Sequence, residues 1–294
     1  MSASPVGALV LAARPKTLTA AFVPVLVGTA LAAALEHPIA WWRAGLALLG
    51  AGAIQIGTNL FNDLLDFQRG ADTSRRVGPI RVTQAGLLSP AMVRGAAITS
   101  FVVALAAGVP LAIVGGLPIL VLGLLSLGFG YAYTGGPYPL AYNGLGEIFV
   151  LVFFGLGAVG GTYWLHADAL TPEVALAGAQ VGLLACALLA VNNLRDVVED
   201  ATADKRTLAV MLGTTFGRVE IAALALGPFL LGLTWLPRHR PAAALLPLLA
   251  LPLGIAAVRV VIAHAPGAVY HRALVRAAGL QLAFGALLAL GLVL

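Results

Sequence analysis

The chain has 294 residues, of which 60% are hydrophobic and only 10% charged, whereas soluble domains are typically about 45–50% apolar and about 25% charged. Seventeen Lys and Arg against twelve Asp and Glu give a formal net charge of +5. So few charges exclude a disordered protein and a nucleic-acid binder with a dense basic surface, and a single cysteine excludes an intrachain disulfide. The composition indicates a polytopic membrane protein whose evident partner is the lipid bilayer, with no sign of an obligatory protein partner.

Apolar stretches that are long enough to cross a bilayer as helices recur along the chain. They cover residues 18–36, 43–61, 92–114, 117–134, 145–165, 172–191, 217–236, 242–263 and 273–293. They lack the alternation of a membrane β-barrel. We therefore predict an all-α polytopic membrane protein, with about nine transmembrane helices around a central cavity and a single domain over residues 1–294.

The basic residues lie mostly on one side of these predicted spans. With the N-terminus inside, fourteen of the seventeen Lys and Arg fall in inner loops, and only Arg43, Arg238 and Arg240 fall outside. The positive-inside rule therefore predicts a cytoplasmic N-terminus and an outer C-terminus. We expect an uncleaved first helix and a location in the cell inner membrane.

Acidic residues concentrate in two of the inner loops, at about residues 59–89 and 192–215. These loops hold seven of the twelve acids, namely Asp63, Asp66, Asp72, Asp196, Glu199, Asp200 and Asp204. The first array contains Asn59, Asn62, Asp63 and Asp66, which share one face if the preceding helix continues. Like charges at this spacing repel, and a bound cation would remove the repulsion. Carboxylate and amide oxygens suit a hard ion such as Mg²⁺.

The second array repeats this pattern, because Asn192, Asp196 and Asp200 lie four residues apart. Basic residues accompany both arrays, namely Arg69, Arg75, Arg76 and Arg81 in the first loop and Arg195, Lys205 and Arg206 in the second. Acids that hold Mg²⁺ beside bases that reach phosphate oxygens predict a diphosphate site that faces the cytoplasm. Since four predicted spans separate the arrays, both open on the same side. We expect a parallel internal repeat, about 18–134 and 145–263.

Five segments carry a pattern that is more specific than either array alone. They are residues 14–18, 59–72, 78–86, 133–139 and 192–209. In this order they resemble the UbiA superfamily of intramembrane prenyltransferases. The segments 78–86 and 133–139 resemble the branch of that family that prenylates 1,4-dihydroxy-2-naphthoate in menaquinone synthesis. One position departs from the pattern, since Asp204 stands where a glycine is expected and adds negative charge beside Lys205.

The resemblance implies Mg²⁺-dependent transfer of a polyprenyl group from polyprenyl diphosphate to 1,4-dihydroxy-2-naphthoate, with loss of CO₂, to give demethylmenaquinol. The residues that would hold Mg²⁺ are Asp63, Asp66, Asp196 and Asp200. The amides that would complete or orient its shell are those of Asn59, Asn62 and Asn192.

The remaining expected roles concern the two substrates. The bases that would bind the leaving diphosphate are Arg69, Lys205 and Arg206. The candidates for the acceptor carboxylate are Arg81, Lys16 and Arg14, and Gln84 is the candidate for a ring hydroxyl. The aromatic rings that would shield an allylic cation are those of Tyr133, Tyr138 and Phe149.

Two other classes of protein are compatible with parts of the sequence. The first is a UbiA-type enzyme with 4-hydroxybenzoate or homogentisate as acceptor. The lysine-bearing loop typical of 4-hydroxybenzoate relatives is absent between Tyr133 and Tyr142, which favours the naphthoate. The second is a secondary transporter, for which polar groups near the middle of the spans are expected. A scaffold without activity would leave the paired arrays unexplained.

Overall fold

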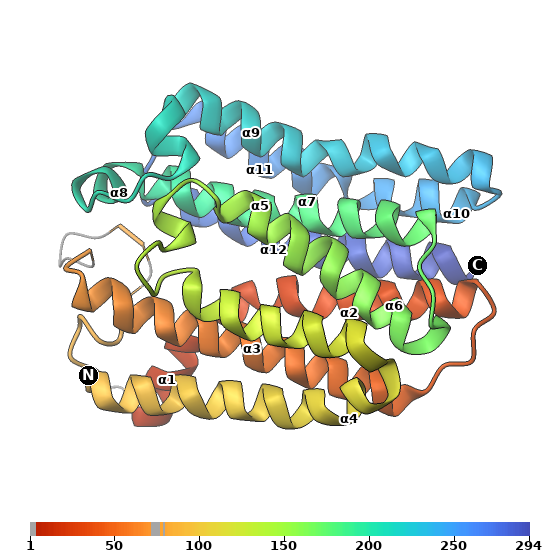
Figure 1. The fold of residues 1–294 in the computed structure, drawn as a ribbon. Helices are drawn as coiled ribbons and strands as arrows, with labels where there is room; N and C mark the ends of the chain where they lie inside the picture. The colour runs from red at the N-terminus through yellow and green to blue at the C-terminus, as the bar shows by residue number, and fades with distance from the viewer. Residues whose placement is uncertain (1–3, 72–76, 79) are drawn as a thin grey trace.

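A computed structural model describes residues 4–71, 77–78 and 80–294, and over these residues the chain is helical with no strand. The helices lie side by side in one elongated bundle, with the two termini at opposite ends (Figure 1). In the described part, seven helices are long and apolar enough to cross a membrane. The number rises to eight if α1 and η1 (Pro5–Thr17) form one bent span with α2 (Thr19–Ala34). The chain is therefore an integral membrane protein, as its composition predicts.

The candidate spans follow the predicted apolar stretches closely. They are α3 (Trp41–Gln68), α4 (Pro90–Ala132), the stretch α5–η3–α6 (Gly146–Ala167), α7 (Pro172–Arg195), α9–η4 (Leu208–Arg238), α10–η5–α11 (Pro241–Ala263) and α12 (Tyr270–Val293). The connecting segments contain the short helices η2 (Leu140–Tyr142) and α8 (Val197–Thr202).

The helix α4 is interrupted in its middle. Its 43 residues would extend about 64 Å at about 1.5 Å per residue, roughly twice the thickness of the hydrocarbon core. At Gly116 the backbone has φ 67° and ψ −157°, and the chain turns back on itself there (Figure 1). Trp164 Nε1 donates a hydrogen bond of 2.9 Å to the carbonyl oxygen of Gly115, directly beside the break. The predicted stretches 92–114 and 117–134 correspond to the two arms of α4.

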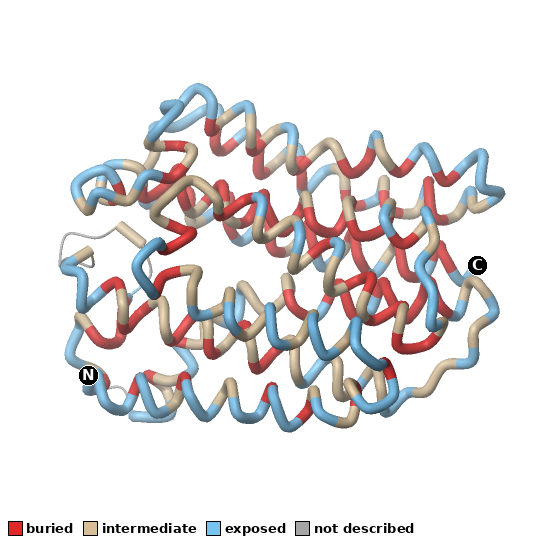
Figure 2. Tube along the Cα trace, viewed as in Figure 1, coloured by how far each residue is buried: buried red, intermediate tan, exposed pale blue. Residues whose placement is uncertain are grey.

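The core of the bundle surrounds α7. Of the apolar window of α7, 72% is buried inside the protein, against 17% for α4, so α4 lies at the periphery of the bundle (Figure 2). The π-helical segment η3 (Leu151–Gly157) packs closely on α7. A Cβ added at Gly155 would lie 2.5 Å from the carbonyl oxygen of Gly178, so this contact requires glycine.

The N-terminal helix α1 (Pro5–Ala13) packs across the end of α3. Ala8 and Ala12 are buried against Leu60 and Leu64 of α3. This packing brings the following turn, η1 (Pro15–Thr17), over the end of the bundle. The carboxyl ends of α3 and α7, which carry the two arrays, lie at this same end (Figure 1), as the even number of predicted spans between them requires.

We predict that Gly116→Ala lowers the stability of the fold by about 1–3 kcal/mol, because the backbone angles of Gly116 are essentially restricted to glycine. The measurement is thermal unfolding of the purified protein in detergent. Gly123→Ala is the matched control, since Gly123 lies within the second arm of α4 and an added Cβ meets no atom within 4 Å. Equal melting temperatures for the two variants would contradict the role of Gly116.

Candidate active site

A cavity of about 1000 Å³ extends through the bundle from the end that carries the two arrays. The charged and amide residues that line the cavity are Arg14, Lys16, Gln55, Asn59, Asn62, Arg81, Asn192, Asn193, Arg195, Asp196 and Lys205. Its long body is lined by apolar side chains of α3, both arms of α4, and η3. The cavity is therefore amphipathic, with its charges confined to one end.

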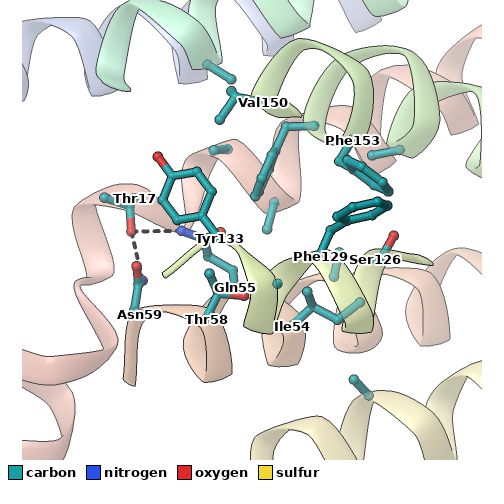
Figure 3. A pocket seen from close by; sticks show the side chains of 18 of the residues that line it. Thr17, Ile54, Gln55, Thr58, Asn59, Ser126, Phe129, Tyr133, Val150 and Phe153 are labelled. Atoms are coloured by element: carbon teal, nitrogen blue, oxygen red, sulfur yellow. Dashed lines mark hydrogen bonds between the residues drawn. The ribbon is translucent and has the colours of Figure 1, made fainter. Parts of the chain in front are cut away.

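Aromatic rings line the cavity beyond its polar end (Figure 3). The ring centroids of Phe129 and Phe149 lie 4.8 Å apart, and those of Phe129 and Phe153 lie 5.3 Å apart. Tyr133 also lines the cavity, as expected, together with Phe149. Tyr138 is 61% exposed and is not among the lining residues, so the third expected ring lies elsewhere.

The amides of the first array connect three segments of the chain. The helix α3 continues through the array to Gln68, as predicted. Asn59 Nδ2 donates to the carbonyl oxygen of Ala13 at 3.0 Å and to Thr17 Oγ1 at 3.1 Å. Asn62 Oδ1 accepts from Arg14 at 3.1 Å, and its Nδ2 donates to Thr134 Oγ1 at 3.0 Å. These bonds hold the N-terminal turn and the end of α4 against α3.

Asp63 is directed away from the cavity and toward a neighbouring loop. It is 2% exposed, and its Oδ2 accepts from the backbone N–H of Val82 at 3.0 Å. Its Oδ1 accepts from the backbone N–H of Thr83 at 3.0 Å and also from the Thr83 hydroxyl. Asp63 thereby fixes the loop that carries Arg81 into the cavity wall. Gln84 lies in the same loop but is not among the lining residues.

Asp66 forms the centre of a polar cluster that includes Tyr142. Its Oδ2 pairs with Arg81 Nη2 at 3.0 Å, and its Oδ1 accepts from the Tyr142 hydroxyl at 2.8 Å. The guanidinium carbon of Arg69 lies 5.0 Å from the centroid of the Tyr142 ring, and Lys205 Nζ lies 5.9 Å from it. Tyr142 thus links both arrays, a role that the sequence did not suggest because its partners are distant along the chain.

Arg206 reaches this cluster through its backbone. Its N–H donates to the carbonyl oxygen of Tyr142 at 3.1 Å, but its side chain is not among those that line the cavity. Arg69 is likewise not among the lining residues. It donates to the carbonyl oxygen of Gly136 at 3.0 Å. Of the three bases expected to bind a diphosphate, Lys205 lines the cavity itself.

The second array lies at a joint between two helices. The helix α7 ends at Arg195 and α8 begins at Val197, with Asp196 between them. The backbone N–H of Asp196 still donates to Asn192 at 3.0 Å, and that of Asp200 to Asp196 at 2.8 Å, so the predicted four-residue spacing persists. Arg195 binds both carboxylate oxygens of Asp196, at 2.6 and 2.8 Å. Asn192 and Asp196 line the cavity, whereas Asp200 does not.

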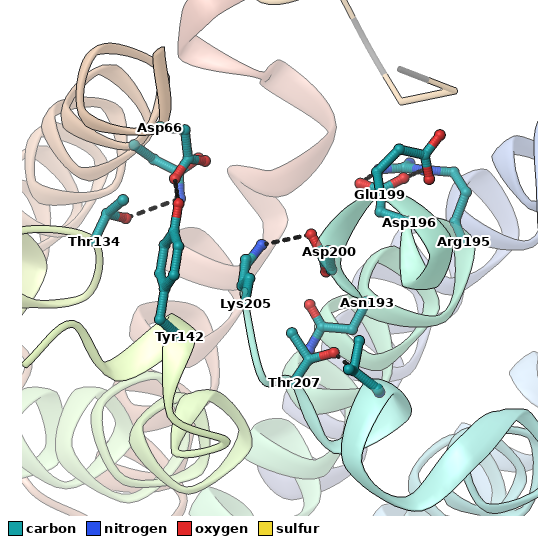
Figure 4. Close-up of polar contacts among 12 residues, drawn as sticks. Asp66, Thr134, Tyr142, Asn193, Arg195, Asp196, Glu199, Asp200, Lys205 and Thr207 are labelled. Atoms are coloured by element: carbon teal, nitrogen blue, oxygen red, sulfur yellow. Dashed lines mark hydrogen bonds and ion pairs between the residues drawn. The ribbon is translucent and has the colours of Figure 1, made fainter. Parts of the chain in front are cut away.

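Lys205 and Asp200 form the third ion pair of the site, with 3.2 Å between Nζ and Oδ1. Figure 4 shows this pair beside the Asp66 and Tyr142 contact, with Asp196 on the far side of Asp200. Behind them, Asn193 Nδ2 donates to Glu147 Oε1 at 2.8 Å. Asp66 of the first array and Asp200 of the second therefore lie on opposite sides of Lys205 (Figure 4), and Asp196 lines the cavity itself.

The donor chemistry of this end fits a hard divalent cation. Carboxylate and amide oxygens are the ligands that Mg²⁺ prefers, together with phosphate oxygens. Among the described residues, no three acidic, histidine or cysteine side chains converge on one point, and Asp66, Asp196 and Asp200 are each paired with a base. The expected residues Asp72, Arg75 and Arg76 lie outside the described part of the chain.

Comparison with known proteins identifies the family. Residues 21–275 match the model of the UbiA prenyltransferase family. The chain belongs to this family. The family resemblance of the five sequence segments is thus confirmed, and the chain is a membrane prenyltransferase rather than a secondary transporter.

Individual relatives agree with this assignment. A 1,4-dihydroxy-2-naphthoate octaprenyltransferase of Mycobacterium tuberculosis is 43% identical over 201 residues, which cover 68% of each chain. One from Escherichia coli is 40% identical over 227 residues, which cover 73% of this chain and 71% of that protein. A solved UbiA homolog from Archaeoglobus fulgidus, bound to GPP and Mg²⁺, has the same fold. It has a TM-score of 0.63 and 16% identity, and the match covers 96% of this chain and 99% of that one.

We predict that Tyr142→Phe lowers kcat/KM for prenyl transfer by about tenfold, because a hydrogen bond to a charged group contributes about 1.5–3 kcal/mol. Phenylalanine keeps the ring between Arg69 and Lys205. Tyr142→Leu removes the ring as well and should lower activity further, while Tyr138→Phe, at an exposed position, is the control. Steady-state kinetics in membranes measure the effect, and unchanged activity in Tyr142→Leu would refute a role for the cluster.

Proposed function

We propose that this UbiA-family chain transfers a polyprenyl group from polyprenyl diphosphate to 1,4-dihydroxy-2-naphthoate, with loss of CO₂, to give demethylmenaquinol. The observation that carries the proposal is the amphipathic cavity, whose charged end suits a diphosphate and an anionic acceptor and whose apolar body suits an isoprenoid chain. Relatives named as 1,4-dihydroxy-2-naphthoate octaprenyltransferases support the choice of acceptor.

The bases at the polar end bind the diphosphate in this proposal. Lys205 reaches it from the cavity wall, and Arg69 and Arg206 contribute positive charge from behind. Their charge compensates the negative charge that develops on the leaving oxygen as the C–O bond breaks. Lys205 is available for this contact because its ammonium group already lies at the cavity, held there by Asp200 at 3.2 Å.

The carboxylates of the two arrays hold Mg²⁺ in this proposal. Asp66, Asp196 and Asp200 supply the carboxylate oxygens, and the cavity-lining amides Asn59, Asn62 and Asn192 complete or orient the shell. Mg²⁺, when bound, would act as a Lewis acid and stabilise the negative charge that develops on the leaving diphosphate. A supporting role fits Asp63 better than ligation, because its oxygens accept from the backbone N–H groups of residues 82–83, whereas Asp66, Asp196 and Asp200 each pair with a basic side chain.

The reacting groups meet where the polar end of the cavity joins its apolar body. Heterolysis of the C–O bond leaves an allylic cation, which the faces of Tyr133, Phe149 and Phe129 shield from water and attract through their π electrons. The ring carbon that bears the carboxylate attacks this cation and forms the new C–C bond. The carboxylate then leaves as CO₂, and the electron pair of the broken bond restores the aromatic ring.

A basic residue must bind the acceptor carboxylate, and the contacts favour Lys16 among the three candidates. Arg14 donates to Asn62, and Arg81 pairs with Asp66. Lys16 lines the cavity and forms no ion pair with any described residue, so its charge remains for a ligand. Arg81 then stays with Asp66 and helps to define the polar end.

The membrane arrangement that fits the fold has nine spans, a cytoplasmic N-terminus and an outer C-terminus. The break at Gly116 divides α4 into two arms, and the termini lie at opposite ends of the bundle (Figure 1). The excess of Lys and Arg near the arrays supports a site on the cytoplasmic side of the inner membrane. One domain built from parallel repeats, about 18–134 and 145–263, accounts for the placement of both arrays at one end.

A membrane assay with two alternative acceptors tests the proposed function. Membranes with the overproduced chain, a polyprenyl diphosphate and Mg²⁺ should prenylate 1,4-dihydroxy-2-naphthoate and release CO₂, and EDTA should abolish the reaction. 4-Hydroxybenzoate and homogentisate should give no product. Product from either of these, with none from the naphthoate, would establish the alternative acceptor class, and no diphosphate release with any acceptor would refute the proposal.

We predict that Lys205→Ala raises the KM for polyprenyl diphosphate by about tenfold or more, since charge-assisted contacts to phosphate contribute about 1.5–3 kcal/mol. The KM for the naphthoate should change much less, because the acceptor carboxylate binds elsewhere. Lys205→Arg keeps the charge and should retain most of the affinity. An equal rise of both KM values in Lys205→Ala would contradict the phosphate role.

A further inference from the structure

Gln55 lines the wall of the cavity (Figure 3) and carries a hydrogen-bond acceptor without a partner among the described residues. It lies on α3, one turn before Asn59, and is only 8% exposed. Its Nε2 donates to Thr17 Oγ1 at 3.2 Å. Its Oε1 is buried and has no hydrogen-bond partner among the described residues. A buried amide oxygen without a hydrogen-bond donor lowers the stability of the fold. We therefore expect a ligand to donate a hydrogen bond to this atom.

The orientation of the Gln55 amide follows from the hydroxyl of Thr17. A hydroxyl has one hydrogen to donate and two lone pairs to accept. Thr17 donates to the carbonyl oxygen of Arg14 at 2.9 Å and accepts from both Asn59 and Gln55. It has no second hydrogen for a flipped amide. In this arrangement the Nε2 of Gln55 faces Thr17, and its Oε1 is the atom without a partner among the described residues.

Only one of the two proposed substrates can satisfy this oxygen. A diphosphate at neutral pH presents oxygens that accept hydrogen bonds, and an isoprenoid chain presents no polar hydrogen at all. The aromatic acceptor carries two hydroxyl groups. Of these, the 1-hydroxyl lies beside the ring carboxylate and bonds to it internally. The 4-hydroxyl is the donor that remains for the protein.

We propose that Gln55 Oε1 accepts a hydrogen bond from the 4-hydroxyl of the naphthoate and thereby determines which aromatic ring the enzyme accepts. This inference rests on the proposed function and adds a specificity residue to it. Lys16 directly precedes Thr17. One short turn therefore supplies the base that binds the carboxylate of the acceptor and the hydroxyl that orients the Gln55 amide toward the 4-hydroxyl of the acceptor. Gln55 takes the role that the sequence suggested for Gln84, whose side chain does not line the cavity.

The test compares two acceptors that differ only at the inferred contact. 1-Hydroxy-2-naphthoate keeps the carboxylate and the 1-hydroxyl but lacks the 4-hydroxyl. Wild-type protein in detergent should bind 1,4-dihydroxy-2-naphthoate about tenfold more tightly than this analogue, as one buried hydrogen bond predicts. Gln55→Met, which keeps the length of the side chain and removes the acceptor, should bind both acceptors equally. Its affinity for polyprenyl diphosphate should equal that of the wild type.

Gln281→Met is the matched control. Gln281 is also a buried glutamine with one hydrogen-bonded and one unpartnered amide atom among the described residues, but it is not among the lining residues. It should keep the wild-type preference between the acceptors. Equal binding of the two acceptors by the wild type would overturn the inference, even if Gln55→Met does not fold. So would an unchanged preference in Gln55→Met, or a loss of its diphosphate affinity in parallel with the loss of acceptor affinity.

Failure of the inference about Gln55 can be distinguished from failure of the proposed function. If the proposed function fails, the wild type does not turn over the naphthoate in membranes. If only the inference about Gln55 fails, the wild type prenylates the naphthoate and the Gln55→Met variant discriminates between the two acceptors as the wild type does.

Discussion

A carboxylate buried at the end of an apolar bundle must have donors, and this requirement organises the polar end of the protein. Removing an unpaired charge from water costs several kcal/mol. Each acid of the two arrays therefore forms a hydrogen bond or an ion pair with a neighbouring group. Asp63 holds the backbone of residues 82–83, Asp66 holds Arg81 and Tyr142, and Asp200 holds Lys205. The loops therefore fold over the end of the bundle, because their N–H groups and basic side chains donate hydrogen bonds to the buried carboxylates.

The same pairing prepares the site for its substrates. In the structure, three carboxylates of the two arrays each pair with a base. A divalent cation and a diphosphate bring opposite charges in comparable amounts. In the proposed function, the cation binds carboxylates of both arrays, and Lys205 turns from Asp200 to the phosphate oxygens.

The apolar part of the cavity depends on a different constraint, namely the close packing of helices through small residues. Gly155 brings η3 against α7, and Gly116 allows α4 to turn back and line the cavity with both of its arms. Helices in lipid associate through such close contacts rather than through exclusion of water. The resulting space is long and apolar, and aromatic rings line it near its charged end. This division into a charged end and an apolar body matches a molecule that is itself a diphosphate joined to a hydrocarbon.

The sequence by itself determined the membrane class, the positions of the apolar stretches and the two Asn/Asp arrays, because lipid requires long apolar helices and tolerates charge only where it is needed. The partners of Asp63 and Asp66 were decided by tertiary structure. Asp63 and Asp66 share a helical face and look equivalent in the sequence, yet one bonds to a loop backbone and the other to Arg81. Tyr142 and Gln55 escaped prediction because their partners lie 76 and 38 residues away. A local pattern cannot specify such contacts, since they exist only after distant segments have packed together.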